Sequence, residues 1–191
     1  MWCYGAKGLR SEANRSTGVR ERGRLALSPD PTPVERIDAT DVQILTLLQS
    51  DGRAKRKDIA ATVGLSLPSV SDRMRKLEER GVVTGYHAVV DPKRLQRDVT
   101  AFVAITSDGS EHYAEFVEAV TAMDEVQELH SVTGDGSHML KVRVRNTTAL
   151  EALLGRLQAI RGVRGTRTSL VLTTLKETRA LAVEPMTLSD L

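Results

Sequence analysis

The stretch from Asp58 to Tyr86 restricts the fold of this 191-residue chain more than any other. It has the pattern of a short helix that ends at Gly64, followed by a second helix that Ser66 caps and that carries Pro68 in its first turn. The inner face of the second helix is formed by apolar residues spaced i, i+4 and i+7: Val70, Met74 and Leu77. Many proteins use two helices joined in this way to place the second one in the major groove of DNA.

Another helix is predicted before this pair. Asp38 is placed to cap it, Asp41 lies near the positive end of its dipole, and Asp51-Gly52 ends it. Its buried stripe consists of Ile44, Leu45 and Leu48. The short helix of the pair is predicted at residues 57–63, so three helices occupy the first part of the chain.

The second half of the chain shows the order strand, helix, strand, strand, helix, strand. The strands are predicted at residues 100–106, 126–132, 138–145 and 166–175. The two helices are marked by apolar faces: Tyr113, Phe116, Val117 and Val120, then Leu150, Leu153, Leu154 and Leu157. Val82–Val90 alternates weakly and is predicted to be a strand or short wing. The expected class is α+β: an N-terminal winged helix-turn-helix domain followed by a ferredoxin-like βαββαβ domain.

The predicted organisation begins with an extension. Residues 1–34 are rich in Gly, Arg, Ser and Pro without periodicity, which predicts a disordered N-terminal extension. A basic arm that touches DNA phosphates and a misassigned translation start are the alternatives. The other parts are a helix-turn-helix DNA-binding domain at 35–91, a linker at 92–98, a βαββαβ domain at 99–183 and a C-terminal tail at 184–191.

The charge balance permits nucleic-acid binding without making the chain a polycation. The net charge is +2; residues 37–90 carry eight Lys and Arg against seven Asp and Glu, whereas residues 91–191 carry twelve against fourteen. The single cysteine, Cys3, excludes a disulfide framework, and no apolar run approaches the length of a membrane span. The N-terminus lacks the apolar core of a secretory signal, so we expect a cytoplasmic protein with no membrane partner.

Several polar side chains of the second helix of the pair lie away from its apolar face. Arginine can hold guanine through two hydrogen bonds, whereas lysine and hydroxyl groups more often contact phosphate. Ser69 and Arg73 are predicted to read bases, and Lys76 is predicted to contact the DNA backbone. Asp72 either accepts from a cytosine amino group or pairs with Lys76 one turn later, and the pairing is the favoured interpretation.

A basic run, Arg53-Ala54-Lys55-Arg56-Lys57, precedes the first helix of the pair. Cations at a helix N-terminus oppose the helix dipole by about 0.3–1 kcal/mol each, so a structural explanation for the run is poor. A DNA phosphate docked there would meet both amide donors and cations. Arg53, Lys55 and Arg56 are therefore predicted to contact DNA, and a tolerated surface charge is the alternative.

Five motifs occur in order along the chain: ERIDATDVQILTLLQSDGR at 35–53, ATVGLS at 61–66, DRMRKLEERGVVTGY at 72–86, VTGD at 132–135 and GVRGTRT at 162–168. Together they resemble those of the Lrp/AsnC (feast/famine) transcription regulators. The resemblance extends from about Ile37 to Val183. It implies double-stranded DNA as the partner of the first domain, a ligand-sensing and oligomerisation role for the second (RAM/AsnC-type) domain, and a homodimer or a higher homo-oligomer such as an octamer.

The resemblance also implies a small-molecule effector, an amino acid or a related compound, and no other cofactor. By this resemblance the effector is bound at the turn after the second strand, by Thr133, Gly134, Asp135 and Ser137. A plain hairpin turn is the alternative, because Gly-Asp-Gly is common turn chemistry. The chain departs from the family at Lys55-Arg56, where Ser or Asn is frequent. It departs again at residues 136–138, Gly-Ser-His, where an aromatic residue and a second Asp often follow Gly-Asp.

Two histidines flank this turn, and histidine side chains can bind metals or take part in catalysis. His130 and His138 are expected to be strand neighbours. Ordinary sheet histidines are the favoured interpretation, and a metal pair is the alternative, although no Cys or third His lies near. A tetrapyrrole (sirohaem) decarboxylase of the same architecture and a weakly specific architectural DNA-binding protein are the rival functions. The chain shows no nucleophile–base pair, phosphate loop or metal set, so no enzyme is expected.

Overall fold

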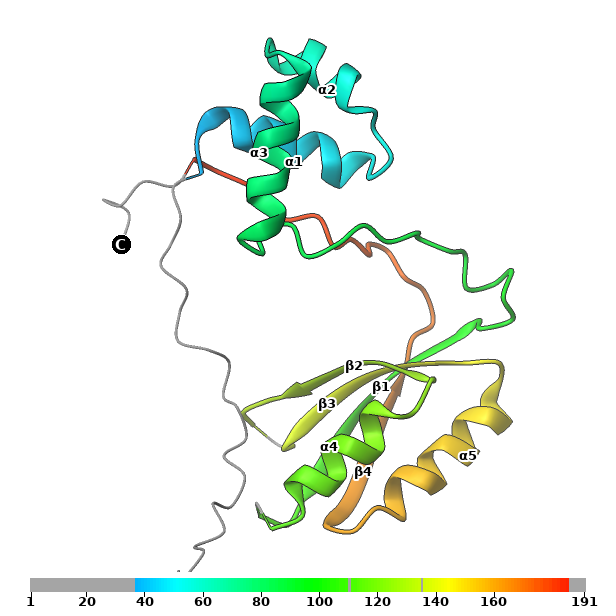
Figure 1. Ribbon diagram of the computed structural model, residues 1–191. Helices are drawn as coiled ribbons and strands as arrows, with labels where there is room; N and C mark the ends of the chain where they lie inside the picture. Colours follow the sequence, from blue (N-terminus) through cyan, green and yellow to red (C-terminus); the bar gives the residue numbers. More distant parts are fainter. Residues whose placement is uncertain (1–36, 110, 135, 186–191) are drawn as a thin grey trace, which may run out of the picture. The chain divides into compact units, whose positions relative to one another are not determined.

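The computed structural model describes residues 37–109, 111–134 and 136–185 (Figure 1). The predicted extension at 1–34 lies outside the described residues, as do Asp135 and the end of the predicted tail. Within the described part, no helix is long and apolar enough to cross a membrane.

Three helices form the first unit: α1 (Ala39–Ser50), α2 (Arg56–Val63) and α3 (Leu67–Glu79). Asp38 caps α1 and Ser66 caps α3, while Gly64 ends α2 with a φ of 71°, a left-handed conformation that favours glycine. The buried core is made of Ile44, Leu45, Leu48, Ile59, Ala60, Val70, Met74 and Leu77. The three helices and their predicted inner faces are confirmed, because caps and apolar spacing are local features of the sequence.

The segment that follows α3 differs from the prediction. Val82–Val90 forms no strand; after the Val83 amide donates to the Leu77 carbonyl (3.0 Å), the chain runs on without regular structure. Val89 is 99% exposed. A strand requires a neighbouring strand to accept its backbone hydrogen bonds, and no described segment takes that place here. The weak alternation of Val82–Val90 was therefore insufficient to predict a strand.

The second unit has the predicted βαββαβ order. Its elements are β1 (Val99–Ser107), α4 (Tyr113–Thr121), β2 (Val126–Ser131), β3 (His138–Val144), α5 (Thr147–Gln158) and β4 (Val163–Leu170). The strands form one antiparallel sheet in the order β2-β3-β1-β4. The two helices cover one face of this sheet (Figure 1). The α+β class is confirmed.

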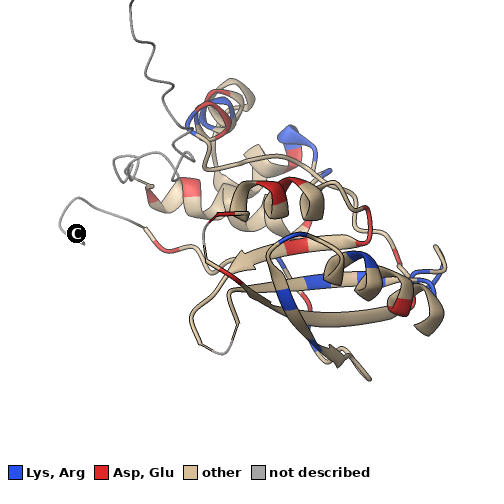
Figure 2. Ribbon diagram, turned by 90° about the horizontal axis from the view of Figure 1, so that it is seen from below, with Lys and Arg blue, Asp and Glu red and all other residues tan. Residues whose placement is uncertain are grey.

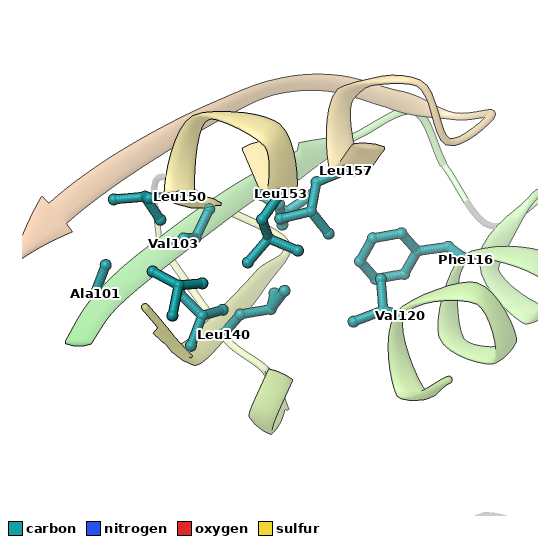
Figure 3. Packing of buried hydrophobic residues seen from close by; sticks show 11 residues of the cluster. Ala101, Val103, Phe116, Val120, Leu140, Leu150, Leu153 and Leu157 are labelled. Atoms are coloured by element: carbon teal, nitrogen blue, oxygen red, sulfur yellow. The ribbon is translucent and has the colours of Figure 1, made fainter. Parts of the chain in front are cut away.

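The core of the second unit lies between the sheet and its helices. Burial alternates along β3, with the even-numbered residues from His138 to Val144 buried, as the period of a strand requires. Figure 3 shows how side chains from both helices meet the inner face of the sheet. The residues labelled there are Ala101, Val103, Phe116, Val120, Leu140, Leu150, Leu153 and Leu157. Leu153 and Leu157 are completely buried, which fixes α5 against the sheet.

The last strand is shorter than predicted and begins earlier. The sequence predicted a strand at 166–175, whereas β4 covers Val163–Leu170. The neighbour of β4 is β1, and their pairing ends at Ala101 and Leu170, followed by one hydrogen bond from the Val171 amide to the Thr100 carbonyl (2.9 Å). Beyond that point β1 offers no further partner, so the chain leaves the sheet.

The segment after β4 makes specific contacts without regular structure. The Gln49 side chain both accepts from the Leu181 amide (2.7 Å) and donates to the Leu181 carbonyl (3.0 Å). Val183 packs against the core of the three-helix unit. The Glu177 carboxylate pairs with Lys141 and, at 2.7 Å, with Arg143 on the outer side of β3. The C-terminal segment therefore contacts both α1 and the sheet.

Candidate DNA-binding surface and effector site

The exposed side of α3 carries the predicted DNA contacts, and part of it is occupied by internal bonds. The Ser69 hydroxyl lies 2.8 Å from the Ser66 hydroxyl that caps the helix. Lys76 Nζ lies 2.7 Å from Asp72 Oδ2, one turn away. The predicted pairing of Asp72 with Lys76 is therefore confirmed.

Arg73 bridges two helices. Its Nη1 donates to Asp38 Oδ2 and to Asp41 Oδ1, both at 2.7 Å. The same two carboxylates cap α1, because Asp38 accepts from the Asp41 amide at 2.8 Å. These bonds raise the pKa of Arg73, Asp38 first and Asp41 second. Burial raises the pKa of Asp38, but the bonds from the Asp41 amide and from Arg73 outweigh it, so that pKa lies below its ordinary value.

Another arginine of α3 pairs within the helix itself. Arg75 lies between Asp72, at 2.5 Å, and Glu79, at 2.7 Å. Figure 2 shows that Lys and Arg interleave with Asp and Glu along the chain rather than gathering in one region. Most of the positive charge on α3 is thus balanced by neighbouring carboxylates.

The N-terminus of α2 has a different environment. Lys55 is its N-cap residue and provides no side-chain capping bond, and the helix begins at Arg56. Among the described residues, Lys55, Arg56 and Lys57 form no ion pair. Three successive cations, followed by Asp58 in the first turn, therefore lie at a helix N-terminus that no side chain caps. An anion is the chemical group that would satisfy both.

A hollow lies beside these cations. Arg53 and Arg56 line it together with Tyr86, whose hydroxyl donates to Glu78 Oε1 at 2.9 Å. Burial, and then the bond to Glu78, raises the pKa of Tyr86 to about 12. No sequence pattern indicates this role for Tyr86, because its partner lies on α3 and the chain between them has no regular structure.

The predicted effector turn joins β2 to β3. Thr133 and Gly134 are exposed, and Gly134 has a φ of 112° that a side chain would strain. Ser137 is held by β1: its amide donates to the Ile105 carbonyl (2.8 Å) and its hydroxyl accepts from the Ser107 amide (3.2 Å). The described part of the turn thus combines an open tip with a base anchored to the sheet.

The two histidines near this turn do not face each other. The register pairs His138 with Ser131 and places His130 opposite Met139, so the side chains point to opposite faces of the sheet. The expectation of neighbouring histidines is wrong by one residue. Among the described residues, no group of three potential ligands could hold a metal. His138 is 4% exposed, its ring lies 5.4 Å from Tyr113 and 4.7 Å from Phe116, and burial lowers its pKa.

Comparison with known proteins decides the family. Residues 37–84 match a family described as winged helix-turn-helix DNA-binding, and residues 100–181 match the Lrp/AsnC ligand binding domain. The HTH-type transcriptional regulator FL11 of Pyrococcus abyssi is 34% identical over 148 residues, covering 78% of this chain and 97% of that protein. The chain belongs to the Lrp/AsnC family.

Other Lrp/AsnC proteins agree with this assignment. The leucine-responsive regulatory protein of Escherichia coli (strain K12) is 36% identical over 155 residues, which cover 80% of this chain and 94% of that protein. The structure of an AsnC family transcriptional regulator from Agrobacterium tumefaciens matches with a TM-score of 0.72 at 32% identity, covering 75% and 95% of the two chains. The feast or famine regulatory protein from M. tuberculosis, complexed with L-methionine, matches with a TM-score of 0.72 at 36% identity, covering 77% and 99%.

The family membership settles the class of function. This Lrp/AsnC chain is a DNA-binding transcriptional regulator, as its relatives are, and not an enzyme. The cited relatives are named as regulators, which favours this function over the decarboxylase alternative. The family description also includes a wing, although Val82–Val90 forms no strand in the chain described here.

Proposed function

We propose that this regulator binds double-stranded DNA with α3 and the N-terminus of α2, and that a free amino acid changes this binding. The observation that carries the DNA half of the proposal is the group of cations at the start of α2, which have no carboxylate partner among the described residues. We assign phosphate contacts to Arg53, Lys55 and Arg56. Chromosomal DNA as the target places the regulator in the cytoplasm.

The contacts of α3 follow from its pairing. Ser69 is exposed near the start of the helix, where side chains of a recognition helix reach base edges. Lys76 is half-exposed and can exchange Asp72 for a DNA phosphate. Arg73 could read a base only by leaving both of its carboxylates. We therefore assign base readout to Ser69, a phosphate contact to Lys76 and a positioning role to Arg73, whose predicted base contact stays a prediction.

We further propose that the protein acts as a homodimer or a higher homo-oligomer such as an octamer. One helix-turn-helix covers little DNA, whereas two copies read two half-sites separated by whole helical turns. The expected operator is an imperfect palindrome. Footprinting at saturation tests this: protection of two half-sites about one turn apart, or a multiple of it, is the expected result, and one asymmetric half-site would contradict it.

The effector is proposed to bind at the turn of the second unit. Two relatives were solved in complex with L-methionine, one from M. tuberculosis and one from Neisseria meningitidis. We assign the contacts to Thr133, Gly134, Asp135 and Ser137. An exposed tip with a glycine lets a ligand approach the backbone, and the Asp135 carboxylate would bind the α-ammonium group.

The effector is tested by operator binding with and without each amino acid. One or more amino acids should shift the affinity of the wild type, and Asp135→Ala should lose the shift while keeping its fold and its affinity without ligand. Asp124→Ala, which removes another acidic residue of the second unit, is the matched control and should keep the shift. Equal shifts in both variants would contradict the assignment of Asp135, and no shift in the wild type would contradict the effector itself.

A further inference from the structure

Leu67, the first residue of α3, is a large apolar side chain in an exposed position. Of the large apolar side chains in α1, α2 and α3, it is the one that remains exposed, at 48%. The others are buried or half-buried. Pro68, which follows it, is exposed as well. The start of α3 therefore presents a small apolar surface.

Neither the cap of α3 nor the core of its unit requires a leucine at this position. The Ser66 hydroxyl caps the helix and accepts from the Ser69 amide at 3.3 Å. The apolar pair that closes a helix start consists of the residue before the cap and the fourth residue after it. These residues are Leu65, which packs against the core, and Val70, which is buried in it. The side chain of Leu67 is thus available for a contact outside this chain.

The place of Leu67 in the fold indicates what it contacts. A single exposed leucine is ordinary on a protein surface, but in a helix-turn-helix the first turn of the second helix reaches base edges in the major groove. Among the four bases, thymine alone presents a methyl group there, and apolar side chains contact it. Ser69 lies about 160° around the helix axis from Leu67, so the two side chains would meet different bases.

We propose that Leu67 contacts the 5-methyl group of a thymine in the operator and thereby selects a T·A pair at that position. This role rests on the proposed function, since it requires that α3 enters the major groove. It adds an apolar contact to the polar readout by Ser69, and it names one base of the operator. Removal of one methyl group from water changes an affinity about fourfold, which is enough to discriminate between bases.

Replacement of thymidine by deoxyuridine tests the contact, because uracil lacks the 5-methyl group and keeps the O4 acceptor of thymine. The probe is a duplex that the wild type selects from random-sequence DNA, with each thymine replaced in turn. At one thymine or more in each half-site, uracil should weaken binding of the wild type about fourfold. The Leu67→Ala variant should bind both duplexes equally at those positions. Leu172→Ala, which shortens a leucine that is 91% exposed after β4, is the matched control and should keep the difference.

The outcomes separate this contact from the proposed function. If uracil has no effect at any position in the wild type, or the same effect in Leu67→Ala, the contact is overturned; a loss of affinity in Ser69→Ala would then keep α3 in the groove. If the wild type selects no duplex, or if neither Leu67→Ala nor Ser69→Ala changes its binding, both the contact and the proposed role of α3 are overturned.

A second copy of this chain is the alternative partner of Leu67. Size-exclusion chromatography of the wild type and of Leu67→Ala distinguishes the two partners. The proposed contact predicts the same oligomeric state for both proteins. A smaller assembly in Leu67→Ala, with the effect of uracil retained, would assign Leu67 to the contact between copies and overturn the contact with thymine.

Discussion

Two basic regions of the helix-turn-helix unit differ in what their charges do. On α3, Arg73 bridges Asp38 and Asp41, and Lys76 pairs with Asp72. At the start of α2, Lys55 and Arg56 have no such partner among the described residues. The sequence presents both regions as runs of cations beside a helix. Of these two regions, the start of α2 is the one whose cations form no ion pair within the described part of the chain.

This difference changes what a cation in a recognition helix signifies. A paired arginine must give up its carboxylates before it can bind a base or a phosphate, so its net contribution to DNA affinity is reduced. An unpaired lysine at a helix N-terminus destabilises the helix unless an anion binds there. We therefore expect Arg73 to stabilise the fold, and Lys55 and Arg56 to contribute to the affinity for DNA.

The largest effect on stability is expected from Arg73→Ala. It removes two charged hydrogen bonds that join α3 to the cap of α1, and it leaves Asp38 and Asp41 without their cation. The free energy of unfolding should fall by about 1–2 kcal/mol, since the pair is partly exposed. Urea unfolding measures this. Unchanged stability together with loss of DNA binding would instead make Arg73 a base reader, as its sequence position predicts.

The same bridge should make the unit sensitive to acid. The pKa of Asp38 is lower in the folded protein than its ordinary value, so the stability it adds is present above about pH 4 and is lost as the pH falls through the lower folded pKa. Arg73→Ala should shrink this acid-dependent loss, because one of its causes is gone. Urea unfolding between pH 3 and 6, roughly the range where carboxylates titrate, compares the two proteins. Parallel curves would contradict the bridge.

A smaller effect is expected beside the basic run. Tyr86→Phe removes the hydrogen bond to Glu78 while keeping the ring against the hollow. The free energy of unfolding should fall by about 0.5 kcal/mol, because the hydroxyl is partly exposed. Thermal and urea unfolding measure it. A loss as large as that of Arg73→Ala would mean that Tyr86 and not Arg73 anchors α3.

The smallest change is expected for Arg75→Ala. Its two ion pairs, with Asp72 and Glu79, lie on the surface of a single helix and connect no second element. Exposed pairs of this kind contribute little, so the unfolding curve should superimpose on that of the wild type. A clear loss of stability would show that an arginine of α3 stabilises the fold without a bridge to α1.

Local signals explain how much of the fold was predictable. Asp38, Gly64 and Ser66 fixed the helix ends because caps act within one turn of the chain. The bridge from Arg73 spans 35 residues in sequence to Asp38, and no local pattern contains it. The end of β4 depended on where β1 stops, and the position of His130 relative to His138 depended on the register between β2 and β3. Each of these features depends on pairing between residues far apart in the sequence, which local patterns do not predict.

The salt dependence of DNA binding tests the central assignment most directly. Each phosphate contact made by a cation contributes about one unit to the slope of log K against log salt. The double variant Lys55→Ala/Arg56→Ala should flatten the slope by about two units relative to the wild type, with Arg75→Ala as the control that leaves it unchanged. An unchanged slope in the double variant would contradict the account.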